Sequence, residues 1–502
     1  MARSSVKIPG NDDFNKVVFL GTYGFFVHVC YMRNVLYTLA MASALFFQAC
    51  QPAPEQPAAV VPSERQLNWQ DLEYYAFVHF SINTFTDKEW GYGDESPELF
   101  NPSELDTDQW ARVAKEAGMK GIIITAKHHD GFALWPSAYT EHSVKNSPWR
   151  DGKGDLLKEL RASCDNYGLK MGVYLSPWDR NHPDYGTEAY ITYYRSQLTE
   201  LLTQYGPLFE VWFDGANGGD GYYGGANEER KVDKLTYYDW PNTHALVRQY
   251  QPDAVMFSDA GPDIRWVGNE KGYANQTTWS TLYRDSVYAG MPDFDRFSAG
   301  QKDGTHWVPT ETDVSIRPGW FYHASEDDKV KTVDHLWDIY LNSVGLNSNL
   351  LLNLPVDRRG LVHETDVERL MGLKEQLDAT FTTNLLASAG LEDLSDSDRT
   401  TYSGLTVTNN KRLEIALDQP VEANLFVIQE AIQLGQHIES FSFFIADTSG
   451  QWQKVYDGTT VGNKRMITFA PQLVSAVAFE VNEARSTAYI AEVALHRAPD
   501  LQ

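Results

Sequence analysis

The chain is short of positive charge. Its 42 lysines and arginines stand against 68 aspartates and glutamates, which gives a formal net charge of -26 at pH 7. The phosphates of nucleic acids and the headgroups of anionic lipids would be repelled by such a protein. We therefore expect no nucleic-acid partner and no peripheral hold on a membrane, whereas a neutral ligand would be indifferent to the charge.

The mostly apolar stretch Val35–Phe47 is too short to span a bilayer as a helix. It follows Met32-Arg33-Asn34 and precedes Gln48-Ala49-Cys50. An export signal has a basic N-terminal region, a short apolar core and a small residue before the cleavage site. Because this one ends on a small residue and Cys50, it resembles a bacterial lipoprotein signal, in which the cysteine is acylated. The alternative is an apolar segment that ends at a cysteine by chance.

This reading divides the N-terminal part of the chain. We expect 1–31 to be an upstream extension from a misplaced start codon, 32–50 to be the signal and the Pro-rich 51–64 to be a tether. The mature protein would then be exported and lipid-anchored, in the periplasm or at the outer-membrane surface of a Gram-negative bacterium. With only three cysteines, Cys30, Cys50 and Cys164, the mature chain would have no disulfide and no cysteine metal cluster.

Apolar runs typical of buried strands alternate with amphipathic helical stretches between residues 65 and 381. One such stretch, Asp106–Ala117, has acidic N-terminal residues, helical periodicity and Gly118 as a stop. Strands and helices that alternate over roughly 300 residues predict parallel βα units, and at this length a (β/α)8-type barrel. The predicted strands are 75–80, 121–125, 170–175, 209–213, 254–257 and 348–354.

The pattern changes after Thr382. Runs of period two appear there, among them Leu413–Leu417, Ala423–Ile428 and Ser440–Ile445. Short alternating strands separated by turn residues predict an antiparallel β-sandwich over 382–502.

Polar side chains follow the predicted barrel strands, at the end where such barrels keep their chemistry. They are His79, His128, His129, Asp130, Tyr174 and Asp214. An aspartate before a glycine is most often part of a turn. Asp214 differs because it follows the apolar run Val211-Trp212-Phe213, which would desolvate its carboxylate in part and suit it to attack an acetal carbon.

Cleavage of an acetal with retention requires a second carboxyl group, which protonates the leaving oxygen and then activates water. Glu270, in the hexapeptide Arg265-Trp-Val-Gly-Asn-Glu270, is the first candidate and Glu311 the second. Either could also be a solvated loop acid.

The pair His128-His129 raises the question of a metal. Because successive side chains at a strand end point to opposite faces, we expect the two not to grip one ion. No third ligand stands at a metal-site spacing. We therefore expect no metal and no cofactor, and assign the histidines to hydrogen bonding with sugar hydroxyls; a metal-dependent sugar hydrolase would instead lose activity in EDTA.

Five motifs in order resemble glycoside hydrolase family 29, the retaining α-L-fucosidases. They are Phe77-Val-His-Phe-Ser81, Glu89-Trp90, Lys127-His-His-Asp-Gly-Phe132, Gly172-Val-Tyr-Leu-Ser176 and Trp212-Phe-Asp-Gly215. The resemblance runs over most of the chain from about residue 65 and implies that fucosylated oligosaccharides or glycoconjugates are the substrates. It implies that Asp214 is the nucleophile, and that the C-terminal domain is of the galactose-binding-like type. The fucose pocket that it implies consists of His79, Glu89, Trp90, His128, His129, Tyr174 and Trp212, with Trp320 packed on the sugar ring or its methyl group.

The acid/base residue separates two branches of this family. The hexapeptide that ends at Glu270 is similar to the branch that cleaves α-1,3/1,4-linked fucose from Lewis-type glycans. In the broad-specificity branch the acid lies closer to the later motif Arg317–Tyr322, where Glu311 stands. A further alternative is a non-catalytic glycan-binding lipoprotein, which should lack one of the two carboxylates.

Overall fold

The structure is a computed structural model that describes residues 60–406 and 411–500. The predicted signal, the acylated Cys50 and most of the tether lie outside these residues. Within them, no helix is both long enough and apolar enough to cross a membrane.

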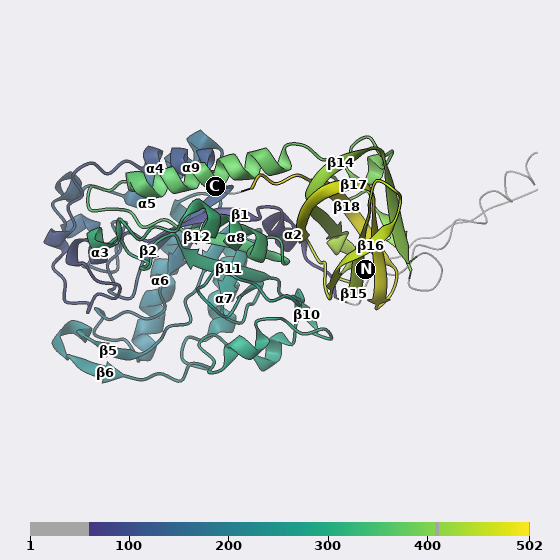
Figure 1. The fold of residues 1–502 in the computed structure, drawn as a ribbon. Coiled ribbons are helices and arrows are strands. Elements are labelled where there is room, and N and C mark those ends of the chain that lie inside the picture. The colour runs from purple at the N-terminus through teal and green to yellow at the C-terminus, as the bar shows by residue number, and fades with distance from the viewer. Residues whose placement is uncertain (1–59, 407–410, 501–502) are drawn as a thin grey trace, which may run out of the picture. The chain divides into compact units, whose positions relative to one another are not determined.

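Eight parallel strands form a closed barrel in the order β1-β12-β11-β8-β7-β4-β3-β2. Figure 1 labels β1, β2, β11 and β12 of this barrel. The first strand pairs with the last, with Tyr74 opposite Leu350, so the sheet has no free edge. The strands are β1 (Tyr74–Val78), β2 (Gly121–Lys127), β3 (Lys170–Leu175), β4 (Glu210–Trp212), β7 (Val255–Ser258), β8 (Ile264–Trp266), β11 (Thr310–Ser315) and β12 (Ser348–Asn353).

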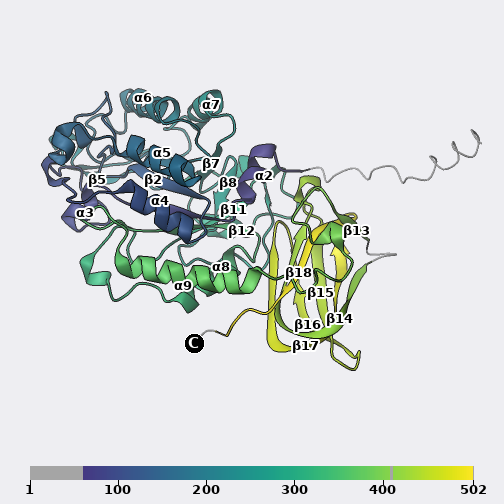
Figure 2. The same cartoon turned by 90° about the horizontal axis from the view of Figure 1, so that it is seen from above.

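Helices cover most of the barrel, and Figure 2 shows the strands flanked by α6 and α7 on one side and by α8 and α9 on the other. Asp106 caps α4 by accepting from the backbone N–H groups of Asp108 and Gln109, as the acidic start of this segment predicts. The helices are α2 (Glu64–Gln70), α3 (Ile82–Thr86), α4 (Thr107–Glu116), α5 (Leu156–Tyr167), α6 (Glu188–Gln204), α7 (Trp240–Tyr250), α8 (Val333–Ser343) and α9 (Glu364–Phe381).

The regular alternation of strand and helix breaks on one side of the barrel. A short connection without a helix joins β7 to β8, and the long segment from β8 to β11 contains two 3-10 turns and a small ladder. That ladder pairs β9 (Thr281–Leu282) with β10 (His306–Trp307), and a second one pairs β5 (Gly219–Gly221) with β6 (Glu228–Arg230). The fold is therefore a (β/α)8-like barrel in which β8 and β11 were not predicted from the sequence.

The C-terminal part is antiparallel, as its period-two pattern predicts. Its six strands form one hydrogen-bonded sheet in the order β13-β18-β14-β17-β15-β16. Register shifts interrupt the pairing of the two longest strands, β14 and β17, and the sheet surrounds a core that includes Phe426, Phe443 and Phe479. The bounds are β13 (Ser403–Leu405), β14 (Arg412–Glu430), β15 (Ile438–Ala446), β16 (Trp452–Gly458), β17 (Arg465–Ala484) and β18 (Ala488–His496).

Candidate active site

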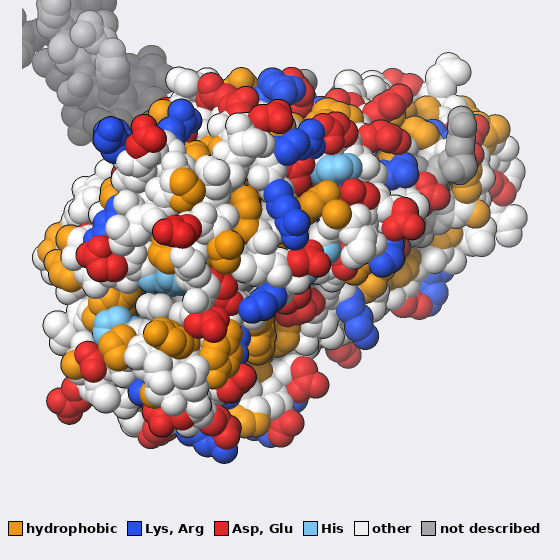
Figure 3. All heavy atoms as spheres, turned by 90° about the vertical axis from the view of Figure 1, so that its left-hand side faces the viewer, with side chains coloured by type: hydrophobic (Ala, Val, Ile, Leu, Met, Phe, Trp, Pro, Cys, Tyr) orange, Lys and Arg blue, Asp and Glu red, His pale blue; other side chains and the backbone are white. Residues whose placement is uncertain are grey.

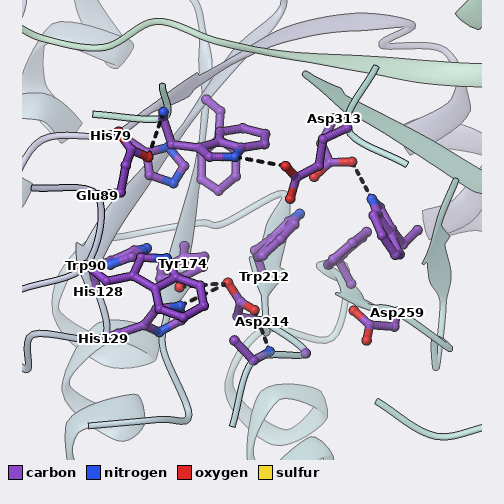
Figure 4. Close-up of a pocket in the computed structure, with 17 residues that line it drawn as sticks. His79, Glu89, Trp90, His128, His129, Tyr174, Trp212, Asp214, Asp259 and Asp313 are labelled. Atoms are coloured by element: carbon purple, nitrogen blue, oxygen red, sulfur yellow. Dashed lines mark hydrogen bonds and ion pairs between the residues drawn. The ribbon is translucent and has the colours of Figure 1, made fainter. Parts of the chain in front are cut away.

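A cavity of about 260 Å³ lies at the carboxyl ends of the barrel strands (Figure 4). Every residue predicted for the pocket lines it, whereas Glu311 does not. The lining side chains come from the ends of seven of the eight barrel strands or from the loops that follow them, because barrel closure turns these ends toward one mouth. They belong to Phe77, His79, Glu89, Trp90, His128, His129, Tyr174, Trp212, Asp214, Ala216, Phe257, Asp259, Trp266, Glu270, Asp313 and Trp320.

Asp214 follows β4 directly, and its carboxylate is partly buried. The backbone N–H of Ala216 donates to Oδ1 at 2.6 Å, and the Tyr174 hydroxyl donates to Oδ2 at 2.9 Å. Burial raises the pKa of Asp214 above its usual value, and these two hydrogen bonds oppose that rise because they favour the ionised form. The group is thus a fixed carboxylate with raised basicity, facing the cavity.

Glu270 lies in a different electrostatic setting. Its contact with the rest of the site is a long hydrogen bond of 3.3 Å from the Trp320 indole N–H to Oε2. Burial raises the pKa of Glu270, and the negative charges of Asp214 and Glu89 raise it further, against the opposing effect of the Trp320 bond. The charges near Glu270 therefore favour its protonated form, whereas the hydrogen bonds to Asp214 favour its ionised form.

Glu311 is fully buried inside the barrel. It accepts hydrogen bonds from the Tyr75 hydroxyl and, at 2.8 Å, from the Trp212 indole N–H. Since Asp313 lies two residues further along β11 and lines the cavity, the side chain of Glu311 points the same way but lies one layer deeper. The geometry does not bring Glu311 to a ligand in the cavity.

His79 is a neutral hydrogen-bond acceptor toward the cavity. The Asn353 side-chain amide donates to Ser315 Oγ and to the Trp320 carbonyl, so its Oδ1 accepts from His79 Nδ1–H at 2.7 Å. Burial lowers the pKa of His79 to about 3. Its Nε2 therefore carries a lone pair and suits a hydroxyl donor.

His129 has the same tautomer for a similar reason. The Ser176 hydroxyl donates to the Trp178 carbonyl at 2.6 Å and accepts from His129 Nδ1–H at 2.7 Å. Burial lowers the pKa of His129 to about 3, so its Nε2 is a second acceptor, 3.8 Å from Asp214 Oδ2. His129 Nε2 and Asp214 Oδ2 are both acceptors, so a donor such as a ligand hydroxyl would be stabilised between them.

The expectation that His128 and His129 face opposite ways is wrong. Both rings line the cavity, and their centroids are 4.1 Å apart. The strand alternation does not apply because β2 ends at Lys127 and the two histidines belong to the turn that follows. Among the described residues, no group of three or more histidine, cysteine, aspartate or glutamate side chains has an arrangement that could hold a metal ion.

Aromatic rings form much of the remaining surface. Trp212 stacks on Phe257 with a centroid distance of 4.1 Å and on Tyr174 at 5.3 Å. Trp90 is 54% exposed and meets the ring of His129 edge-on. Such rings combine apolar faces with polar edges, so the cavity suits a ligand that has both C–H faces and hydroxyl groups.

Two acidic residues of the site were missed by the sequence reasoning. Burial raises the pKa of Asp259 to about 6 and the charge of Asp214 adds to the rise, although the Gly290 N–H donates to its Oδ2 at 2.8 Å. The pKa of Asp313 lies well above its usual value through burial, and the Trp266 indole donates to its Oδ1. Asp259 follows a predicted strand and could have been found by its position. Asp313 lies on a strand that was not predicted.

Gly215, which follows Asp214 in the sequence, lies close to the side chain of Asp259. A Cβ at Gly215 would lie 2.0 Å from Asp259 Oδ2, so any other residue at this position would displace the Asp259 carboxylate.

Comparisons with known proteins agree on one family. The sequence model described as alpha-L-fucosidase matches residues 55–379. A protein of Arabidopsis thaliana named alpha-L-fucosidase 1 is 41% identical over 459 residues, which cover 88% of this chain and 88% of the relative.

Solved structures give the same result. A glycoside hydrolase 29 family member from an unknown rumen bacterium matches with a TM-score of 0.82 and 47% identity, over 89% of this chain and 79% of that one. A glycoside hydrolase 29 fucosidase of Ruminococcus gnavus in complex with fucose matches with a TM-score of 0.79 and 30% identity, over 90% of this chain and 97% of that one.

The hydrogen bond from Tyr174 to Asp214 generates a prediction about charge. Tyr174→Phe removes a donor that favours the ionised carboxylate, so the pKa of Asp214 should rise. The titration of the ¹³C-labelled Asp214 carboxyl, followed by NMR, measures this shift.

Tyr194→Phe is the matched control, because the buried Tyr194 hydroxyl donates to the Leu175 carbonyl and not to Asp214. An unchanged Asp214 titration in Tyr174→Phe, or an equal shift in both variants, would contradict the assignment.

Proposed function

The chain belongs to the α-L-fucosidase family of glycoside hydrolases, and from this premise we propose that it releases terminal α-1,3/1,4-linked L-fucose from Lewis-type branched glycans by double displacement with retention. The substrate is uncharged at the bond that is cut. Figure 3 shows acidic and basic side chains interspersed over the face it draws, without a continuous surface of one sign that would select a charged partner.

The contrast between Asp214 and Glu270 carries this proposal. Both line the cavity, yet the hydrogen bonds to Asp214 favour its ionised form, while the charges around Glu270 favour its protonated form. Burial raises both pKa values, but two donors oppose the rise at Asp214, whereas neighbouring negative charges add to the rise at Glu270. Such a difference in surroundings is what assigns one carboxyl as nucleophile and the other as acid.

In the first step, Asp214 attacks the anomeric carbon of fucose as the bond to the leaving oxygen breaks, and Glu270 gives that oxygen its proton. Glu270 is now ionised. Because Asp214 is esterified and has lost its charge, one of the causes that raise the pKa of Glu270 disappears. In the second step Glu270 takes a proton from water, whose oxygen attacks the anomeric carbon and releases Asp214. Two inversions give net retention, for which we expect the two carboxyls to lie about 5–5.5 Å apart.

The histidines and aromatic rings would recognise the sugar. The Nε2 atoms of His79 and His129 accept from fucose hydroxyls, and the donor needed between His129 and Asp214 is one of them. Trp320 lies 5.1 Å from the His79 ring, centroid to centroid, and offers its face to the sugar ring or its methyl group.

The choice of Glu270 over Glu311 also decides the proposed linkage. Glu270 lines the cavity and ends the hexapeptide that resembles the α-1,3/1,4-specific branch, whereas Glu311 is buried beneath the cavity with its oxygens engaged.

Variants of the two carboxyls should fail in different ways. Asp214→Ala should lower kcat by roughly three orders of magnitude or more on every substrate, because the covalent step is lost. Glu270→Ala should keep substantial activity on aryl fucosides with good leaving groups, and azide should accelerate it and give fucosyl azide of retained configuration, observed by NMR.

Glu311→Ala serves as the comparison. Azide rescue of Glu311→Ala together with full activity of Glu270→Ala on natural glycans would overturn the acid assignment and favour the broad-specificity alternative.

The proposed linkage predicts a substrate preference. The enzyme should release fucose from a Lewis-type trisaccharide with a higher kcat/KM than from an α-1,2-linked fucosyl disaccharide, measured by fucose release at matched concentrations. Equal rates on both, with fast cleavage of simple aryl fucosides, would contradict the narrow specificity.

We also propose that Cys50 is acylated and anchors the exported enzyme to a membrane, on the sequence pattern of residues 32–50. Expression of the full chain in a Gram-negative host with labelled palmitate should give a labelled, membrane-associated enzyme, and Cys50→Ser should give an unlabelled one. Label that persists in Cys50→Ser, or an unlabelled wild-type chain, would sink this part of the proposal.

A further inference from the structure

Two glutamates lie inside the barrel beneath the cavity. Glu210 of β4 and Glu311 of β11 are both fully buried, and neither lines the cavity. In the part of the chain that the structure describes, no lysine, arginine or histidine forms an ion pair with either. Two ionised carboxylates next to each other without a cation would be strongly unfavourable in this setting.

The donors around the pair are unevenly distributed. Glu311 accepts at both oxygens, from the Tyr75 hydroxyl and the Trp212 indole. Glu210 accepts from the Trp69 indole at Oε2, at 3.0 Å, while its Oε1 has no donor among the described residues. The two carboxyls are within hydrogen-bonding reach of each other. A proton on Glu210 would let its carboxyl donate a hydrogen bond to Glu311 and would remove the repulsion between the two negative charges.

We propose that Glu210 and Glu311 share one proton, carried by Glu210, and that the ionised Glu311 is a positioning residue that fixes Trp212 beneath the substrate. Trp212 is the link to the chemistry. Its indole N–H bonds Glu311, its ring stacks on Tyr174, and the Tyr174 hydroxyl holds Asp214. The inference rests on the proposed role of Asp214 for its effect on catalysis, but not for the position of the proton.

The pKa directions agree with this assignment. Burial raises the pKa of Glu210 well above its usual value, and the charge of Glu311 raises it further. Burial also raises the pKa of Glu311, but the hydrogen bonds from Tyr75 and Trp212 oppose this rise because they favour its ionised form. Both sets of causes direct the proton to Glu210.

Replacement of each glutamate by glutamine tests the asymmetry. In Glu210→Gln the amide N–H₂ replaces the acid O–H as a donor to Glu311, so kcat/KM should stay within about twofold of wild type. In Glu311→Gln an amide donor replaces a charged acceptor and the bond to Trp212 weakens, so kcat/KM should fall by about 10-fold or more. The loss should be the same for good and poor leaving groups and should not be rescued by azide.

Glu200→Gln is the matched control. Glu200 is also buried and accepts from an indole, that of Trp135, but it lies away from the cavity. The Glu200→Gln variant should lose as much thermal stability as the other two variants, but kcat/KM of the folded enzyme should not change.

Infrared spectroscopy of the folded proteins tests the proton directly, independently of activity. The carbonyl band of protonated carboxyls at neutral pH should lose the contribution of one group in Glu210→Gln, seen as a negative band in the difference spectrum against wild type, and should be unchanged in Glu200→Gln. An unchanged band in Glu210→Gln, or equal losses of kcat/KM in Glu210→Gln and Glu311→Gln, would overturn the proposal. Azide rescue of Glu311→Gln would instead show that Glu311 is the acid/base, which is a failure of the proposed function.

Discussion

In the barrel, the first strand lies beside the last, with Tyr74 of β1 opposite Leu350 of β12. This pairing closes the sheet, and closure brings residues from opposite ends of the catalytic region into contact. His79 and Asn353 are 274 positions apart in the sequence, yet the hydrogen bond between them decides which nitrogen of His79 faces the cavity. In an open sheet the same side chains would lie along one edge and would not surround a common cavity.

Burial in this closed space raises the pKa of Asp214, Asp259, Glu270 and Asp313, and the hydrogen-bond donors around each carboxyl oppose that rise to different degrees. Asp214 has two such donors and Glu270 has a single long one. One layer deeper, Glu311 has donors at both oxygens and Glu210 lacks one at Oε1. Trp212 connects the cavity with the layer beneath it, because its indole N–H donates to Glu311 and its ring stacks on Tyr174, which holds Asp214. The charge on Glu311 can therefore affect the position of the proposed nucleophile through this ring.

The sequence was sufficient for the architecture where strands are apolar, and failed where they are not. The six apolar runs are barrel strands, but β8 is only three residues long and β11 reads Thr-Glu-Thr-Asp-Val-Ser, a polar pattern typical of a loop. The missing β11 had two consequences for the site: Asp313 was overlooked, and Glu311 was considered as an acid although alternation along β11 places it below the cavity. The two histidines were assigned to opposite faces because strand alternation was applied to residues that follow the end of β2 and belong to the turn after it. Asp259, directly after a predicted strand, was within reach of the same reasoning that found Asp214.

The central claim is that Asp214 forms a covalent bond to fucose. Incubation with a 2-deoxy-2-fluoro-fucosyl fluoride, which forms the glycosyl-enzyme but slows its hydrolysis, followed by proteolysis and mass spectrometry, tests this claim most directly. We expect a single labelled peptide with the sugar on Asp214. A label on another carboxyl such as Asp259, or rapid turnover of the reagent to inverted product with no labelled peptide, would contradict it.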